Sequence, residues 1–257
     1  MRQFKTEILG NRIEKGDYYT LLLRKPRGLK KALPGQILNI RINDKCDPLL
    51  RRPFGVHDEV GGRIAVLYKV VGKATRELAG KRKGDILDVL GPLGNGFDLK
   101  RAGGRHAVLV GGGHGVAPLY ALAKNLSGGR RTRLTVLIGA KSGSLVVCRS
   151  AFIRLGAKVL VATDDGSMGH KGVVTDLLEK TVTRGPAVVY ACGPKPMLRK
   201  VAEITLELDI ACQLSMEEYM GCGTGVCMGC SVDTVSGKKL VCKDGPVFEA
   251  KEITWDS

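Results

Sequence analysis

Half of the eight cysteines lie close together near the carboxyl terminus: Cys222, Cys227, Cys230 and Cys242. The spacing C-x4-C-x2-C, with a fourth cysteine further along, is typical of plant-type [2Fe–2S] proteins. A loop wrapped around such a cluster supplies three thiolates from a short stretch, and the fourth returns from a more distant strand. Glycines at positions 221, 223, 225 and 229 let backbone amides approach the sulfurs. The pattern therefore predicts that these four cysteines bind one [2Fe–2S] cluster.

A structural zinc site is the alternative for the same cysteines. Zinc sites usually use paired C-x2-C knuckles, and only Cys227 and Cys230 form one here. The segment contains no histidine, which excludes a Rieske-type centre. The chain also starts without an apolar signal-peptide core, so metal or redox chemistry is favoured over disulfides. The [2Fe–2S] interpretation is preferred.

A second candidate site is the glycine-rich turn of Gly111, Gly112, Gly113 and Gly115. It lies between an apolar stretch and a segment with helical periodicity, where helix N-terminal amides can bind a pyrophosphate. The turn departs from G-x-G-x-x-G because Val116 replaces the third glycine. Close packing of strand and helix is the alternative explanation for the glycines.

Cys192, Gly193 and Pro194 form another turn, directly after the apolar stretch 187–191. Ligand crevices of doubly wound sheets lie at such strand ends, and proline is favoured at a helix start. Cys192 is the candidate to approach a nicotinamide, and its alternative is a small buried residue at a strand end. His114 is interpreted as a loop residue of the nucleotide site, because the motif offers it no carboxylate partner.

The elements that must position these residues fall into three parts. Residues 1–102 contain short, partly alternating strands and one helical segment, 73–79, which together indicate an antiparallel β-barrel. Residues 103–211 alternate nearly continuous apolar strands with helices, which is typical of a doubly wound parallel sheet. Residues 212–257 are a small cysteine- and glycine-rich subdomain that needs a metal cluster to hold it together. The chain is thus expected to be a multidomain α/β plus β protein, with a hinge at 100–105.

Composition narrows the possible functions. The net charge of the 257 residues is +16, but the 41 Lys and Arg are scattered and only 5% of residues are aromatic. Nucleic-acid binding by basic and stacking side chains is therefore not expected. No apolar run approaches the roughly 18 residues of a membrane helix, so the sequence predicts a cytoplasmic protein without a membrane span.

Taken together, these motifs resemble those of ferredoxin–NADP reductase-like flavoproteins. With the Cys-Gly-Pro turn and the cysteine cluster, the whole chain resembles the electron-transfer subunits of class 1B dihydroorotate dehydrogenase. The motifs occur in the family's order: Arg51-Arg-Pro-Phe-Gly55, Leu67-Tyr-Lys-Val-Val-Gly-Lys-Ala-Thr75, Gly91-Pro-Leu-Gly94, the turn 111–118, Cys192-Gly-Pro194 and the four cysteines.

The resemblance implies an FAD site in the barrel. Its residues would lie on two strands and at the start of the following helix: Arg52, Pro53, Phe54, Gly55, Leu67, Tyr68, Lys69, Ala74 and Thr75. The last two would lie beside the pyrophosphate. Gly55 is more often serine in the family and Ala74 more often glycine, so side-chain tuning of the flavin at position 55 is in doubt. Without the resemblance, these residues would be read as barrel core with a solvated arginine pair.

The resemblance also implies a function. Electrons from dihydroorotate, oxidised by a separate FMN-containing catalytic subunit, would pass through the cluster and FAD to NAD+ in pyrimidine biosynthesis. The assembly would be a heterotetramer with two copies of each subunit. Alternatives are a reductase subunit of a hydrogenase or of an electron-bifurcating oxidoreductase, and a non-catalytic ferredoxin-like carrier. The bifurcating type often has aspartate at the first cluster position, and Cys222 therefore favours the dihydroorotate version.

Two finer expectations concern the dinucleotide and the partner surface. Asp164 and Asp165 follow the third strand of the parallel sheet and would repel a 2′-phosphate, although Lys141 follows the second strand. NAD(H) is therefore expected rather than NADP(H). An apolar contact surface near the cluster is expected from Met216, Tyr219, Met220 and Met228, unless these side chains pack inward.

Overall fold

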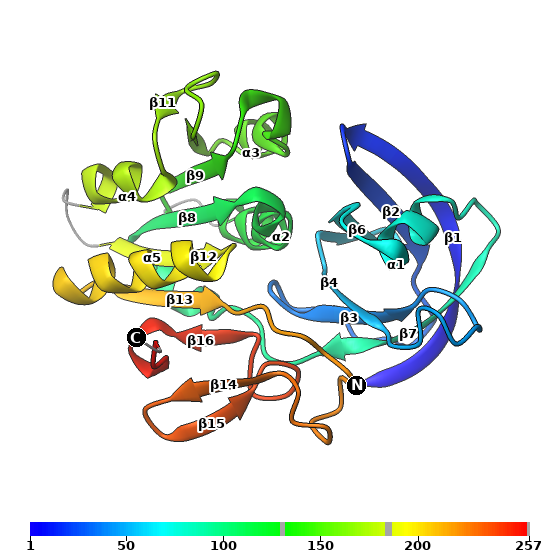
Figure 1. Cartoon of the computed structure of the whole chain (residues 1–257). Helices are drawn as coiled ribbons and strands as arrows, with labels where there is room; N and C mark the ends of the chain where they lie inside the picture. Colours follow the sequence, from blue (N-terminus) through cyan, green and yellow to red (C-terminus); the bar gives the residue numbers. More distant parts are fainter. Residues whose placement is uncertain (129–131, 183–186, 256–257) are drawn as a thin grey trace.

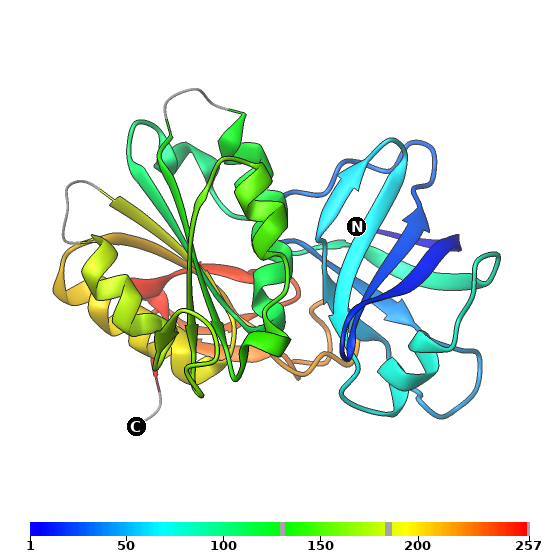
Figure 2. The same ribbon diagram turned by 90° about the horizontal axis from the view of Figure 1, so that it is seen from above.

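The structure is a computed structural model that describes residues 1–128, 132–182 and 187–255. Two large bodies lie side by side, with the carboxyl-terminal segment against both (Figures 1 and 2). The expected fold class is confirmed: an antiparallel barrel, a parallel-sheet domain and a small cysteine-rich subdomain. No helix in the described part of the chain is long and apolar enough to cross a membrane.

The amino-terminal body is an antiparallel sheet of order β4-β3-β7-β1-β2-β6-β5, curved so that β4 also contacts β6. Alternating side chains such as Leu21 and Leu23 are fully buried and fill its interior. The strand Arg52–Gly55, not expected from the sequence, closes one edge. The elements are β1 (Arg2–Lys15), β2 (Tyr18–Arg24), β3 (Ile37–Arg41), β4 (Arg52–Gly55), β5 (Asp58–Val60), β6 (Arg63–Lys69), α1 (Lys73–Ala79), β7 (Ile86–Leu93) and the 3-10 turn η1 (Leu99–Ala102).

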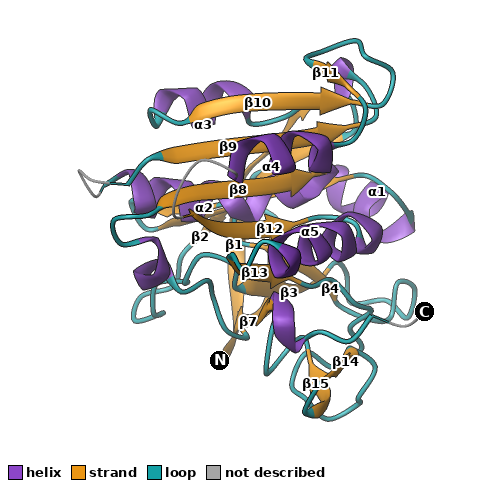
Figure 3. Cartoon of the chain, turned by 90° about the vertical axis from the view of Figure 1, so that its left-hand side faces the viewer, coloured by secondary structure: helices purple, strands orange, loops and turns teal. Residues whose placement is uncertain are grey.

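The second body is a mostly parallel sheet of order β11-β10-β9-β8-β12-β13-β16. The strand β8 is buried along its whole length, because helices cover both faces of the sheet (Figure 3). Its elements are β8 (His106–Gly112), η2 (Gly113–Gly115), α2 (Val116–Ser127), β9 (Leu134–Ala140), η3 (Gly143–Leu145), α3 (Arg149–Arg154), β10 (Lys158–Thr163), β11 (His170–Lys171), α4 (Val174–Val182), β12 (Ala187–Cys192), α5 (Lys195–Glu207) and β13 (Ala211–Ser215).

The boundary expected between residues 211 and 212 falls inside β13. Cys212 pairs with Val189 of β12 in the parallel sheet and is buried, so residues 212–215 belong to the sheet. The remaining segment forms the hairpin β14 (Ser231–Thr234) and β15 (Gly237–Leu240), then β16 (Val247–Glu249) and η4 (Ala250–Glu252). Because β16 pairs antiparallel with β13, the cysteine-rich segment is attached to the sheet edge.

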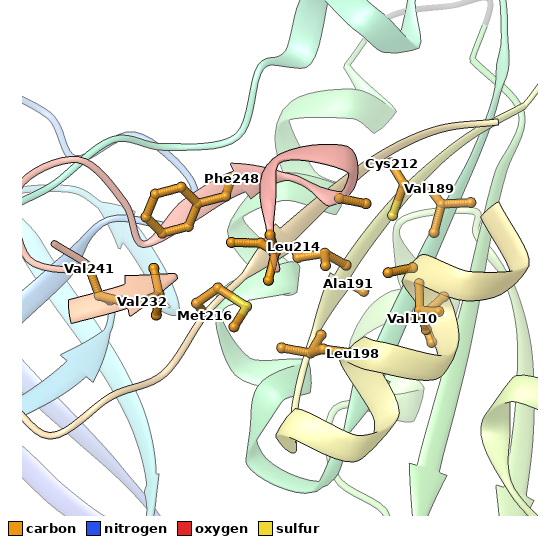
Figure 4. Close-up of a cluster of buried hydrophobic side chains, with 14 of the residues drawn as sticks. Val110, Val189, Ala191, Leu198, Cys212, Leu214, Met216, Val232, Val241 and Phe248 are labelled. Atoms are coloured by element: carbon orange, nitrogen blue, oxygen red, sulfur yellow. The ribbon is translucent and has the colours of Figure 1, made fainter. Parts of the chain in front are cut away.

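A shared hydrophobic core holds the three parts together. Leu198 and Leu214 of the parallel-sheet domain pack in one cluster with Val232, Val241 and Phe248 of the carboxyl-terminal segment (Figure 4). Ile37, Leu90 and Leu93 of the barrel belong to the same cluster. The cysteine-rich segment is therefore anchored by apolar packing against both larger bodies.

Candidate electron-transfer sites

The two turns predicted to bind a dinucleotide lie against each other. Cys192 pairs with Gly111 at the carboxyl ends of β12 and β8. The strand order reverses between these two strands, which is where ligand crevices form in doubly wound sheets. A Cβ atom on Gly115 would lie 2.2 Å from the Cys192 carbonyl oxygen, and one on Gly112 would lie 2.8 Å from Pro194 Cδ. Close packing between the two turns thus accounts for these glycines.

The barrel contacts α2 of the parallel-sheet domain through β4, β5 and the residues between them. His57 Nδ1 donates a hydrogen bond to the carbonyl oxygen of Ala117 at 2.8 Å, and Lys124 Nζ lies 2.8 Å from Asp58 Oδ1. A Cβ atom on Gly55 would be 3.1 Å from Pro118 Cβ. The candidate flavin strand and the candidate nucleotide helix are therefore in direct contact at position 55.

The residues expected to hold the flavin gather where β4 and β6 approach each other. Phe54 meets Tyr68 edge to face, with 5.8 Å between ring centroids. Arg52 Nη1 donates to the carbonyl oxygens of Leu50 and Arg51 at 2.7 and 3.2 Å. Pro53 faces β3, where it pairs with Asn39. The structure thus brings the predicted β4 and β6 residues together, although the two strands are not neighbours in the sheet order.

The remaining residues predicted to bind the flavin lie closer to the sheet domain or in α1. Leu67 packs into the core of the sheet domain, and Lys69 Nζ lies 5.6 Å from the Tyr18 ring centroid. Ala74 and Thr75 are buried in the first turn of α1. The Thr75 hydroxyl accepts hydrogen bonds from the amides of residues 71 and 72, so it closes this turn and is not free for an anion.

His114 has a carboxylate partner that the sequence motif did not reveal. Its Nε2 lies 3.2 Å from Glu217 Oε2, on the segment that follows β13. The hydrogen bond to Glu217 raises the pKa of His114, and the same bond lowers the pKa of Glu217. Lys69 opposes the shift at His114 and is therefore close enough to act on it. His114 and Glu217 thus pair across two elements, and the charge of Lys69 acts on the pair.

Cys192 is a neutral thiol in this position. Burial raises its pKa to about 12, and a hydrogen bond with Ser215 on the neighbouring strand opposes that shift only in part. Nucleophilic cysteines require a lowered pKa, so Cys192 is not suited to act as a nucleophile. Its neutral, buried thiol is suited to packing beside a ligand.

The strand ends expected to select the dinucleotide also lie next to each other. The amides of Asp164 and Asp165 donate to the carbonyl oxygens of Ala140 and Lys141 at 3.2 and 3.3 Å. Hydrogen bonds from Ser167 lower the pKa of Asp165 and keep its carboxylate ionised. The edge of the sheet at the ends of β9 and β10 therefore carries two acidic residues, Asp164 and Asp165, beside Lys141.

The four clustered cysteines form two unlike pairs. Cys222 is half-buried and Cys227 exposed, and Cys222 Sγ accepts hydrogen bonds from the amides of Thr224 and Cys227 at 3.3 and 3.4 Å. Burial raises the pKa of Cys222, but the hydrogen bonds outweigh it and lower this pKa to about 5. Cys230 and Cys242 are buried, and burial together with their mutual hydrogen bond raises the pKa of Cys242 to about 12.

This arrangement fits the donor set of a [2Fe–2S] cluster. The four thiols are free, and backbone amides already point at one sulfur, as thiolate ligands require. Within the described ranges, no three His, Cys, Asp or Glu side chains converge on the position of a single metal ion. A [2Fe–2S] cluster instead divides its four thiolates between two irons.

An open hollow of about 330 Å³ lies beside the first cluster cysteine and is lined by Arg41, Leu49, Leu50, Arg51, Gly221 and Cys222. We call residues 219–230, which contain the first three clustered cysteines, the cysteine loop. Tyr219, Val226 and Met228 of this loop are exposed, and so are Leu49 and Leu50. We call these five residues the cluster-loop surface. Of the four side chains expected in such a surface, Met216 and Met220 are instead buried in the shared core.

Comparison with known proteins identifies the family to which this chain belongs. Residues 217–254 match the family described as the iron–sulfur cluster binding domain of dihydroorotate dehydrogenase B, and residues 109–203 match the oxidoreductase NAD-binding domain. The electron transfer subunit of dihydroorotate dehydrogenase B (NAD(+)) from Bacillus caldolyticus is 45% identical, with 86% of each chain covered. The chain belongs to this family of electron transfer subunits.

Other comparisons extend over nearly the whole chain. The corresponding subunit from Desulforamulus reducens is 36% identical and covers 98% of both chains. A solved structure titled as an NADH-dependent reduced ferredoxin–NADP oxidoreductase, studied for flavin-based electron bifurcation, is 33% identical. It covers 97% of this chain and 90% of its own, with a TM-score of 0.86. The resemblance predicted from the motifs is thus confirmed for the family and the fold.

Proposed function

We propose that this chain relays electrons between NAD(H) and a catalytic dihydroorotate dehydrogenase subunit, through FAD and one [2Fe–2S] cluster. The observation that carries the proposal is the placement of the cysteine loop against a barrel that also contacts the dinucleotide edge of the parallel sheet. A bound flavin would supply the chemistry that links two-electron hydride transfer with single-electron transfer. The chain's own residues have to bind and orient the groups and exclude water from them.

The flavin is proposed to lie between the barrel and the edge of β8 and β12. Arg52, Pro53, Phe54 and Gly55 on β4 would hold it from one side. Leu67, Tyr68 and Lys69 on β6 would hold it from the neighbouring strand, and Ala74 and Thr75 of α1 would contribute backbone amides. The contact of Gly55 with Pro118 leaves little room for a larger side chain there, which supports binding through the backbone at this position.

NAD(H) is proposed to bind at the turns of β8 and β12. The turn of Gly111, Gly112, Gly113 and Gly115 would hold the pyrophosphate, together with the amides at the start of α2. Cys192, Gly193 and Pro194 would form the opposite wall. The proposed position of the nicotinamide is between Cys192 and the flavin strand. The acidic edge at Asp164 and Asp165 supports NAD(H) over NADP(H).

The catalytic partner is proposed to dock on the cluster-loop surface. Tyr219 is 92% exposed and Val226 is 79% exposed, although both are large apolar side chains. Exposed apolar side chains rimmed by arginines are typical of protein–protein contacts, and Arg41 and Arg51 line the adjoining hollow. The proposed assembly is a heterotetramer of two copies of each subunit. Docking here would place the cluster at the interface, where single electrons can cross.

The test is whether dihydroorotate oxidation needs the partner. The isolated chain should reduce artificial dyes with NADH and show no orotate formation. Addition of an FMN-containing catalytic subunit should start NAD+-dependent orotate formation, whereas free FMN should not. Robust orotate production by this chain with FAD as its only flavin would refute the subunit assignment.

A second candidate is the electron-bifurcating reductase subunit, because the solved structure with a TM-score of 0.86 bears that title. Cys222 at the first cluster position favours the dihydroorotate function over this candidate. The two candidates predict different partners, so the proteins that copurify with the full chain distinguish them. A non-catalytic carrier would contain the cluster but no FAD and would not reduce dyes with NADH.

A further inference from the structure

Asn39 is a buried polar residue on the outer face of the barrel. Its neighbours in β3, Leu38 and Ile40, are fully buried in the barrel interior. Asn39 must therefore point to the opposite side, as Ile37 does, since side chains alternate along a strand. Ile37 packs in the core shared with the cysteine-rich segment. Asn39 has no exposed surface either, so that segment covers it.

The Asn39 amide lies against Gly223 of the cysteine loop. A Cβ atom on Gly223 would lie 2.6 Å from Asn39 Nδ2 and 3.2 Å from Leu93 Cδ1. Gly223 follows the first cluster cysteine and has a φ of +74°, a left-handed conformation that glycine adopts without strain. The Asn39 amide thus touches the loop between Cys222 and Cys227.

Both polar atoms of this amide lack a hydrogen-bond partner. Among the buried side chains of the described residues, only Asn39 and Trp255 have such unpaired atoms. Leaving a buried amide unpaired is unfavourable, and a leucine, whose side chain has the same number of heavy atoms, would avoid this cost. On its own sheet Asn39 is flanked by Pro53 and Leu90, whose side chains offer no polar partner. The missing partner must therefore come from the side of the cysteine loop.

We propose that Asn39 is a positioning residue for the iron–sulfur cluster, with its Nδ2–H donating to a sulfur of the bound cluster or of its cysteine ligands. The inference rests on the proposed cluster at Cys222, Cys227, Cys230 and Cys242. Hydrogen bonds to cluster sulfurs stabilise the more negative, reduced form and so raise the reduction potential. Asn39 also pairs with Pro53 of the candidate flavin strand, so it would link the barrel that binds the flavin to the loop that binds the cluster.

The experiment compares the cofactor-loaded wild type with Asn39→Leu, which keeps the number and branching of side-chain heavy atoms but cannot donate. The cluster midpoint potential is followed by electron paramagnetic resonance during a redox titration, and the flavin potential by absorbance in the same samples. We expect a lower cluster potential and altered g-values in the variant, with about two irons retained and the flavin potential unchanged. A serine side chain is too short to reach the cluster, so Asn39→Ser should also lower the cluster potential. This variant is used if the leucine variant does not fold.

The matched control is Thr6→Val, a buried polar-to-apolar change in the same barrel. The Thr6 hydroxyl bonds to the Arg24 carbonyl oxygen, so its loss should lower stability without moving the cluster potential. An unchanged cluster potential in iron-replete Asn39 variants would overturn the proposal. A shift in the flavin potential alone would overturn it as well and assign Asn39 to the flavin. Wild-type protein without iron would instead refute the proposed function, and the two failures are thus distinct.

Discussion

Gly94 at the end of the barrel strand β7 packs directly on Gly245 of the cysteine-rich segment. A Cβ atom on Gly94 would lie 2.1 Å from the Gly245 carbonyl oxygen and 2.7 Å from Pro246 Cδ. The neighbouring Asn95 donates from its side chain to the carbonyl oxygen of Asp244 at 2.9 Å. The barrel therefore contacts the chain only a few residues beyond Cys242, the proposed fourth cluster ligand, and this contact holds the cysteine-rich segment against the barrel.

The first prediction is that Gly94→Ala destabilises both the fold and the cluster. Gly94 has a φ of +71°, and this conformation alone costs an alanine about 1–2 kcal/mol. The clash with Gly245 adds to that cost. Gly62→Ala is the matched control, because Gly62 has a φ of +70° and no atom near its Cβ position. Urea unfolding should show a larger loss for Gly94→Ala, together with lower iron content. Equal losses in the two variants would show that the contact is unimportant.

The second prediction concerns the cluster ligands. Protein purified without oxygen should contain about two irons and two sulfides per chain, with a visible charge-transfer spectrum. Cys227→Ser should lose most of this iron, because one thiolate of the four is removed. Cys46→Ser is the control, since Cys46 is an exposed cysteine outside the cluster segment, and it should keep the full content. Stoichiometric zinc without iron in the wild type would contradict the assignment.

Much of this fold could be predicted from the sequence, and the reasons are local. The strands β8 and β12 are buried on both faces, so they read as continuous apolar runs. The four clustered cysteines are proposed as cluster ligands because a single loop can supply three of them. The boundary expected at residue 212 falls inside β13, where Cys212 packs as a small apolar residue of the sheet.

The parts that could not be predicted depend on contacts between distant segments. His114 and Glu217 are 103 positions apart, and no local motif connects them. A useful signal was that Glu217 lies just after a strand of the parallel sheet, at the same edge as the glycine turn. The burial of Asn39 also depends on a distant segment, because the cysteine loop covers its face of β3. Met216 and Met220 are buried for the same reason.

The third prediction is that His114 titrates above its ordinary pKa of 6.5 because of Glu217. The imidazole signals of the four histidines can be followed by NMR, and His114→Gln identifies the one of interest. Glu217→Gln should lower the pKa of His114. His57 is the internal control, because burial lowers its pKa and its ring bonds to Ala117, so Glu217→Gln should leave it unchanged. If the pKa of His114 were the same in Glu217→Gln as in the wild type, the pairing would be contradicted.

The same pair should contribute to stability within a limited pH window. Glu217 has its ordinary pKa at 4.5 and His114 at 6.5, so between these values the charged pair is fully formed. The contribution is lost as the pH rises through the raised pKa of His114, and also as it falls through the lowered pKa of Glu217. Both side chains are largely exposed, at 48% and 65%, so the effect should be small. The difference in Tm between wild type and Glu217→Gln should be largest near the middle of the window.

The last prediction is that Val226→Ser weakens binding of the catalytic subunit. Val226 lies in the cysteine loop between Cys222 and Cys227, and a docked partner would bury its side chain. Loss of a central apolar contact costs about 2 kcal/mol, which corresponds to roughly 30-fold in Kd. Val235→Ser is the matched control, because Val235 is similarly exposed in the same segment but lies at the turn between β14 and β15. Titration calorimetry with the catalytic subunit should show weaker binding for Val226→Ser only, and both variants should reduce dyes with NADH as the wild type does. Unchanged binding by Val226→Ser, or equal weakening by both variants, would place the partner on another face.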